Sequence, residues 1–154
     1  VYGHNEFHKK SMKSVILKTY NQIKLNQETR LFKSHNKKYK NGEQKRDFVY
    51  IKDCIKVLLW FLENPSKSGI FNVGTGTSRS FIDLVTSVYK EMNRNININF
   101  IAMPLEIKDK YQYETKANIK NIRSIGYKAK FFSLEEGIKD YISILERNKF
   151  NGVS

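Results

Sequence analysis

Cysteine and long apolar runs are scarce in this 154-residue chain. The one cysteine, Cys54, excludes a disulfide within the chain and suits a reducing compartment, so we expect a cytoplasmic protein. No apolar run approaches the roughly 20 residues that span a bilayer, and residues 1–11 lack the apolar centre of a signal peptide. We therefore expect no membrane partner.

Motifs that would identify a nucleotide, metal or nucleophile site are also missing. The stretch "NVGTGTS" at residues 72–78 contains G-x-G but not the G-x-G-x-x-G of a dinucleotide-binding turn. No P-loop or nucleophile elbow is present. His4 and His8 are four residues apart, but no third ligand follows at a useful spacing, so we expect no metal site.

Acidic residues are in short supply relative to basic ones. The net charge is +13, from 28 Lys and Arg against 15 Asp and Glu, which leaves a basic nucleic-acid-binding module open as an alternative. The lysines, however, are spread along the whole chain, and the aromatic residues fall at core spacings. The pattern favours lysines scattered over solvated faces, and we expect no nucleic-acid partner.

What is present is an alternation of strand and helix patterns, which predicts an α/β protein. Helical spacing and capping residues predict helices over residues 11–26, 53–63, 81–92, 116–127 and 134–145, and short apolar runs predict strands over 46–51, 69–76 and 98–104. Asn41-Gly42 marks a turn in a polar loop.

The stretch "QKRDFVYIKDCIKVLLWFLE", residues 44–63, holds the most specific local pattern. An Arg-Asp pair, Arg46 and Asp47, precedes an aromatic strand, and Asp53 is expected to cap the following helix. That helix is apolar on several sides, so we expect it to be broadly covered. A guanidinium can bind phosphate oxygens in a bidentate way, with Asp47 orienting it.

Seven segments occur in an order that matches a known family: "VYG", "HKKSM", "LFKS", "QKRDFVYIKD", "WFLEN", "GIFNVGTG" and "KYQYETKANI". The chain resembles the C-terminal half of the ADP-L-glycero-D-manno-heptose 6-epimerases, which are extended short-chain dehydrogenases/reductases of lipopolysaccharide core synthesis. The resemblance implies the C-terminal part of a Rossmann-like fold with the smaller substrate-binding domain, over residues 1–154. It implies a homo-oligomer that acts on ADP-heptose with NADP.

The same resemblance implies that the chain is a fragment. In the family the glycine-rich NADP turn and the Tyr-x-x-x-Lys pair lie upstream of the matched segments, and the first residue here is Val and not Met. We therefore expect the N-terminal half to be absent and the isolated chain to be inactive and to bind NADP poorly.

Site residues follow from the resemblance. Lys9 corresponds to the family's acid/base lysine and also contacts the cofactor, and Val1 corresponds to a backbone contact near the nicotinamide. The substrate contacts implied are Ser11, Lys18, Phe32, Lys33, Ser34, His35, Arg46 and Tyr111. Lys18 stands where the family usually has histidine, and His4 and Asn5 stand where it usually has Pro-Arg, so the loop before Lys9 is expected to differ.

Two further alternatives stay open beside the nucleic-acid module. One is another extended nucleotide-sugar epimerase or dehydratase, which the Lys9 and Tyr111 segments disfavour. The other is an inert half that works only together with a separate N-terminal chain.

Overall fold

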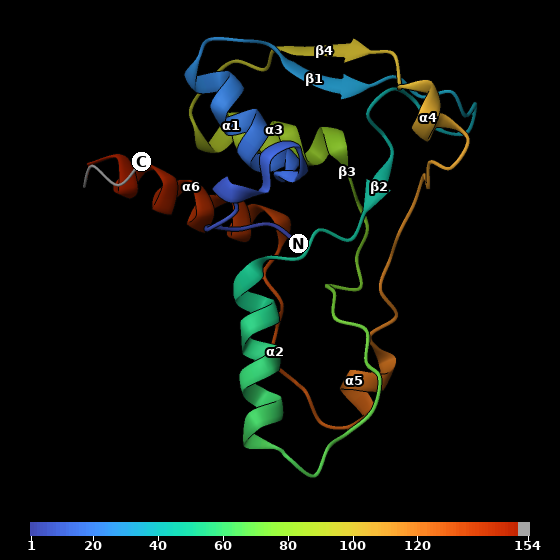
Figure 1. Ribbon diagram of the computed structural model, residues 1–154, viewed down its shortest axis with the longest axis vertical. Coiled ribbons are helices and arrows are strands. Elements are labelled where there is room, and N and C mark those ends of the chain that lie inside the picture. The colour runs from blue at the N-terminus through green and yellow to red at the C-terminus, as the bar shows by residue number, and fades with distance from the viewer. Residues whose placement is uncertain (151–154) are drawn as a thin grey trace.

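The computed structural model describes residues 1–150, with side chains through residue 147. The elements follow in the order η1 (Phe7–Met12), α1 (Val15–Lys24), β1 (Thr29–Phe32), β2 (Lys45–Arg46), α2 (Ile51–Glu63), β3 (Arg79–Ser80), α3 (Phe81–Glu91), β4 (Ile98–Ile101), α4 (Leu105–Lys108), α5 (Lys120–Ser124) and α6 (Leu134–Phe150). Figure 1 shows α1, α3 and α6 gathered beneath a strand pair, and α2 extending away from them. No helix among the described residues is long and apolar enough to cross a membrane.

Two small sheets organise the strands. β1 and β4 pair in parallel, with Thr29 opposite Ile98 and Phe32 opposite Ile101, and lie together at the top of Figure 1. β2 and β3 form a short antiparallel pair, with Lys45 opposite Ser80. The sequence patterns predicted β4 but not its partner β1, because only Leu31 and Phe32 of β1 are apolar, whereas β4 and the residues after it form a longer apolar run.

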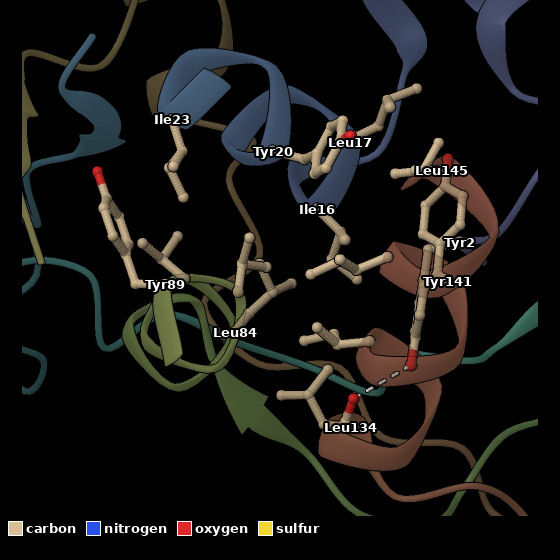
Figure 2. Packing of buried hydrophobic residues seen from close by; sticks show 14 of the residues in the cluster. Tyr2, Ile16, Leu17, Tyr20, Ile23, Leu84, Tyr89, Leu134, Tyr141 and Leu145 are labelled. Carbon is tan, nitrogen blue, oxygen red and sulfur yellow. Dashed lines mark hydrogen bonds between the residues drawn. The ribbon is translucent and has the colours of Figure 1, made fainter. Parts of the chain in front are cut away.

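The main core lies between α1, α3 and α6. Buried side chains from these helices converge in Figure 2, where Tyr2 joins them and its hydroxyl contacts the carbonyl of Leu134 at 3.5 Å. The apolar face of each helix supplies residues at three- and four-residue spacing. The helix residues labelled there are Ile16, Leu17, Tyr20 and Ile23 from α1, Leu84 and Tyr89 from α3, and Leu134, Tyr141 and Leu145 from α6.

The first predicted helix was placed too early. It begins at Val15, and Ser14 is its N-cap, with the Ser14 hydroxyl accepting the Leu17 N–H at 3.2 Å. Ser11 instead lies in the 3-10 turn η1, which Lys10 interrupts with φ 45° and ψ −117°. A backbone in that region cannot continue a right-handed helix, so residues 11–14 stay outside α1.

The strands predicted over 46–51 and 69–76 were wrong in most of their length. Only Lys45–Arg46 is a strand, and Tyr50 makes a single parallel bridge to Tyr2. Residues 69–76 form no strand, and Ile70 is 97% exposed. A strand exists only where a neighbour accepts and donates its backbone hydrogen bonds, and the described residues supply none along 69–74.

The helix predicted over 53–63 is α2, but its start and its environment differ from the prediction. It begins at Ile51, and Asp53 does not cap it, because the Asp53 carboxylate is buried and accepts the Phe132 N–H at 2.9 Å. Val57 is the one apolar residue of α2 that is fully buried, so the broad cover expected for this helix was wrong. Its exposed apolar residues are Ile55, Leu58, Leu59 and Leu62.

The two longest C-terminal helices agree with the prediction, but α5 covers only Lys120–Ser124 of the helix predicted over 116–127, and β4 only Ile98–Ile101 of the strand predicted over 98–104. α3 begins with a complete capping box between Ser80 and Asp83, as predicted. Ser133 and Glu136 make the same reciprocal pair at the start of α6, which then runs five residues beyond the predicted end at residue 145. The alternation of helices with short strands confirms the α/β class.

Candidate functional site

A cleft of about 420 Å³ opens between α1, β1 and β2. Its size falls within the range of small-molecule sites, which are roughly 300–1,000 Å³. Its walls come from six separate stretches of the chain. The lining residues are Val15, Lys18, Thr19, Gln22, Arg30, Leu31, Phe32, Gln44, Arg46, Phe81, Ile101 and Tyr111. Four of the predicted substrate contacts therefore meet here: Lys18, Phe32, Arg46 and Tyr111.

Arg46 presents an uncompensated positive charge to this cleft. Its guanidinium lies 5.1 Å from the ring centroid of Tyr111 and 5.8 Å from that of Phe81, and it donates to the Lys45 carbonyl at 2.7 Å. No carboxylate of the described residues lies within 4.0 Å of it, whereas Arg79 is bound to both Asp83 and Glu135. A half-buried arginine stacked between two rings and free of carboxylates is suited to bind an anionic ligand.

Asp47 does not orient Arg46, contrary to the interpretation of the Arg-Asp pair. Its carboxylate accepts the backbone N–H of Thr75 at 2.9 Å, of Gly76 at 2.9 Å and of Ala117 at 3.1 Å, and the Thr75 hydroxyl at 2.6 Å. A Cβ on Gly74 would clash with the Cβ of Ala117, so only glycine permits this approach. Asp47 thus joins the "VGTG" turn to residue 117 behind the cleft.

One face of α1 forms a wall of the cleft. Val15, Lys18, Thr19 and Gln22 follow one another at the i, i+3, i+4, i+7 spacing that aligns side chains on a helix. The Thr19 hydroxyl is buried and has no hydrogen-bond partner among the described residues. Sequence reasoning selected Lys18 alone, although the helical spacing already placed Gln22 beside it.

Tyr111 belongs to an aromatic wall that closes the cleft on one side. Its ring lies 5.5 Å from that of Tyr113, which also contacts His35 and Tyr39. Burial raises the pKa of the Tyr111 hydroxyl, and the charge of Arg46 opposes the rise. Tyr111 is therefore neutral at physiological pH, when it can donate and accept hydrogen bonds.

The predicted residues 33–35 lie next to the cleft without lining it. The Lys33 N–H donates to the Ile101 carbonyl at 2.8 Å, that of Ser34 to the Asn41 side chain at 2.9 Å, and that of His35 to the Tyr113 hydroxyl at 2.9 Å. The His35 ring also contacts the Tyr113 hydroxyl and the Lys108 carbonyl. In this conformation the backbone N–H groups of residues 33–35 and the His35 ring hold the loop through these hydrogen bonds and are not free to bind a ligand.

A second cleft, of about 230 Å³, adjoins the first. Val15 and Arg46 line both, and Val1 lies in the second together with Asp47 and Phe48. Arg46 thus stands at the junction of the two spaces. Nothing in the sequence pattern indicated this, because the contact depends on how β2 passes the start of the chain.

Lys9 and Ser11 lie outside both clefts. Both are exposed residues of η1, and the Lys9 backbone N–H donates to the Glu6 carbonyl at 3.1 Å. The Ser11 carbonyl accepts from the Lys18 ammonium at 2.7 Å, which links the loop to the wall of the larger cleft. Within the described residues, no group of three or more His, Cys, Asp or Glu side chains could hold a metal ion.

Comparison with known proteins agrees with this architecture. The sequence profile of the NAD dependent epimerase/dehydratase family matches residues 1–74. Residues 1–74 are thus similar to this family, and the chain has the fold of its extended short-chain dehydrogenase/reductase members, as expected from the sequence.

Within that family the chain is similar to ADP-L-glycero-D-manno-heptose-6-epimerases. It is 46% identical to that of Nitratidesulfovibrio vulgaris strain DP4 over 142 residues, which are 92% of this chain and 44% of the relative, and 45% identical to that of Fusobacterium nucleatum, with 92% and 45% covered. The Helicobacter pylori enzyme superimposes with a TM-score of 0.75 at 30% identity, covering 94% of this chain and 41% of that one. The chain thus spans less than half the length of the curated relatives it matches.

Proposed function

We propose that this chain forms the nucleotide-sugar-binding part of an ADP-L-glycero-D-manno-heptose 6-epimerase. The observation that carries the proposal is the meeting of Lys18, Phe32, Arg46 and Tyr111 in one cleft from four distant segments. Two cations and two aromatic rings suit a nucleoside diphosphate sugar, because the phosphates need positive charge and the base and sugar need apolar faces. The names of the relatives supply the sugar as ADP-heptose.

Each cleft residue has a role that its chemistry allows. The Arg46 guanidinium binds the diphosphate, since it is free of carboxylates and held between two rings. Lys18 adds a second cation from α1. Phe32 and Tyr111 pack against the base and the sugar, with the Tyr111 hydroxyl as a hydrogen-bond donor. Ser11 and residues 33–35 stay predicted contacts that would need to move toward the ligand.

Lys9 is the proposed acid/base residue. Inversion at C6 requires the hydroxyl proton to leave and to return, and a lysine can hold or release it once the site closes. The cofactor, proposed as NADP, supplies hydride removal and return when it is bound. Lys9 is exposed and outside both clefts, so closure over the ligand would have to carry it toward the junction at Arg46.

The chain's own share of the cofactor site is small. Val1 lies in the cleft of about 230 Å³ beside Arg46, which fits one end of a nicotinamide cofactor and not its pyrophosphate. The 154 residues contain no glycine-rich turn for that group. A homo-oligomer and a cytoplasmic location are proposed with the activity.

The binding test uses the 154-residue chain and calorimetry. ADP-glucose, a stable ADP-sugar, should bind, and Arg46→Ala should weaken binding by about tenfold to a hundredfold, because a charge-assisted phosphate contact is lost. Arg94→Ala, an exposed arginine outside the cleft, is the matched control. Equal binding of UDP-glucose or dTDP-glucose would favour another nucleotide-sugar enzyme. Unchanged affinity in Arg46→Ala would contradict the placement of the phosphates.

The turnover test supplies the missing length from a relative. The segment that precedes the match in the Nitratidesulfovibrio vulgaris enzyme would be joined to this chain and assayed with NADP and ADP-heptose. We expect epimerisation, and we expect Lys9→Met to lower kcat by about 10² to 10⁴ with little change in KM. Lys10→Met is the neighbouring control. A joined chain that binds ADP-sugar but leaves C6 unchanged would refute the epimerase assignment.

A further inference from the structure

The loop that carries Lys9 has no packing of its own. None of the η1 residues, Phe7–Met12, is buried, and Phe7 and Met12 are 52% and 80% exposed. Asn5 and Lys10 also have positive φ angles, of 64° and 45°, which non-glycine residues rarely adopt. Such a loop keeps one shape only if contacts at its ends hold it.

Glu6 supplies those contacts at the start of the loop. It is 2% exposed, and its carboxylate accepts three hydrogen bonds: from the Ser14 N–H at 2.7 Å, the Ser14 hydroxyl at 2.6 Å and the Tyr141 hydroxyl at 2.9 Å. No cation of the described residues lies within 4.0 Å of it. Removing a carboxylate from water is costly, and these short bonds offset the cost.

The three bonds join both ends of the loop to the core. Ser14 is the N-cap of α1, and Tyr141 is fully buried on α6 (Figure 2). The Glu6 carbonyl in turn accepts the Lys9 N–H, and Lys18 holds the Ser11 carbonyl from the cleft side. The loop that carries Lys9 is thus tied at one side to buried Glu6 and at the other to Lys18 in the wall of the larger cleft.

We infer that Glu6 is the positioning residue for Lys9, acting through the loop without touching the ligand. The inference rests on the proposed acid/base role of Lys9. The Glu6 carboxylate is the essential feature, because glutamine has nearly the same volume but offers one acceptor oxygen in place of two. In Glu6→Gln the amide oxygen can still accept the Ser14 N–H, but the N–H₂ group then faces the Ser14 and Tyr141 hydroxyls, whose hydrogens lose the oxygen that accepts them.

Native trypsin cleavage of the 154-residue chain tests the anchoring. Glu6→Gln should speed cleavage after Lys9, Lys10 and Lys13 by about tenfold or more, since cleavage follows the population of the open loop. Cleavage after Arg94 and Lys110, exposed sites in other loops, should not change and controls for general loosening. Tyr141→Phe, which removes one of the three bonds, should give an intermediate rate. It also serves as the test if Glu6→Gln does not fold.

The joined enzyme then tests positioning. Glu6→Gln should lower kcat by about tenfold to a hundredfold with KM for ADP-heptose within about twofold, because the cleft is unchanged while the loop that must carry Lys9 into the site loses its anchor. Unchanged trypsin cleavage would overturn the inference, and so would faster cleavage with an unchanged kcat. If the unmutated joined enzyme shows no turnover, the proposed function fails and the positioning role fails with it. Proteolysis would then decide only whether Glu6 anchors the loop.

Discussion

The molecule has two regions that bury their apolar residues to different extents. One is the main body, built from α1, α3 and α6, and the other is the arm, built from α2, α5 and residues 127–131. In the body, facing helices enclose one large cluster that includes Ile16, Leu84 and Tyr141 (Figure 2). In the arm, a small cluster of Val57, Ile122, Tyr127 and Phe131 covers one side of α2 and leaves the other open (Figure 1).

The exposed side of α2 has the pattern of a buried helix face. Ile55, Leu58, Leu59 and Leu62 follow the i, i+3, i+4, i+7 spacing, yet Leu58 and Leu62 are 65% and 76% exposed. The apolar pattern of α3 is no clearer, but α1 and α6 pack against it. An amphipathic sequence therefore indicates which face a helix can bury, whereas the neighbouring elements decide whether it is buried.

The largest expected effect separates these two settings with one kind of substitution. Leu84→Ala, in the body, should lower the free energy of unfolding by about 2 to 5 kcal/mol, because Leu84 is 1% exposed and its removal leaves a cavity. Chemical denaturation followed by circular dichroism measures it. A loss as small as that of the same change at Leu62 would mean that the body is not the tightly packed region.

The next effect concerns the turn at residues 74–76, which Asp47 joins to Ala117. Asp47→Ala should lower stability by about 2 to 4 kcal/mol, because three backbone N–H groups, of Thr75, Gly76 and Ala117, lose their acceptor together. Asp109→Ala, at the exposed end of α4, is the matched control. A stable variant whose 74–76 turn stays protected from hydrogen exchange would show that other contacts hold the turn.

A pH-dependent effect is expected at Asp53, which links α2 to Phe132. Burial raises the pKa of the Asp53 carboxyl, while the Phe132 N–H and Lys56 oppose the rise. The pKa of Asp53 is therefore higher in the folded chain than in the unfolded chain. Protonated Asp53 favours folding at pH values below the unfolded pKa, and this contribution to the free energy of unfolding is lost as the pH rises through the folded pKa. Asp53→Asn should therefore stabilise the chain near neutral pH, with a smaller gain in acid, measured as melting temperature against pH.

Asp83 is the control for that experiment, because its pKa is shifted in the opposite direction to that of Asp53. Burial favours a raised pKa there too, but hydrogen bonds from Ser80 and the contact with Arg79 hold the pKa of the Asp83 carboxyl below its ordinary value. Asp83→Asn should destabilise the chain near neutral pH, and the loss should shrink as pH falls through the lowered pKa. The same sign of change for both variants would contradict the assigned environments.

The smallest effect is expected on the open face of α2. Leu62→Ala should change the free energy of unfolding by less than about 0.5 kcal/mol, because the side chain is largely in water already. Leu58→Ala should behave alike. A loss above about 2 kcal/mol from either variant would show that this face is covered in solution, and sedimentation would tell whether by a second copy.

The sequence predicted those features that depend on neighbouring residues. The capping boxes at Ser80 and Ser133 place α3 and α6 correctly, since a cap and its partner lie three residues apart. The family resemblance selected Lys18, Phe32, Arg46 and Tyr111, which the structure brings together in one cleft. Lys9 was predicted as well, but the buried anchor of its loop, Glu6, was not, because an isolated glutamate carries no sign of burial.

Sequence alone thus indicated the longer helices and the capping boxes of α3 and α6, because a cap and its partner lie within a few positions of one another. The order of the seven segments along the chain indicated the family resemblance. Tertiary structure decided that residues 69–76 form no strand, that Asp53 is buried beside Phe132, and that Asp47 holds the turn while Arg46 faces the cleft. Each of these outcomes depends on a partner far along the chain. Whether a segment becomes a strand, and where a carboxylate is buried, depends on hydrogen-bond partners that come from distant parts of the chain. No local sequence pattern specifies those partners.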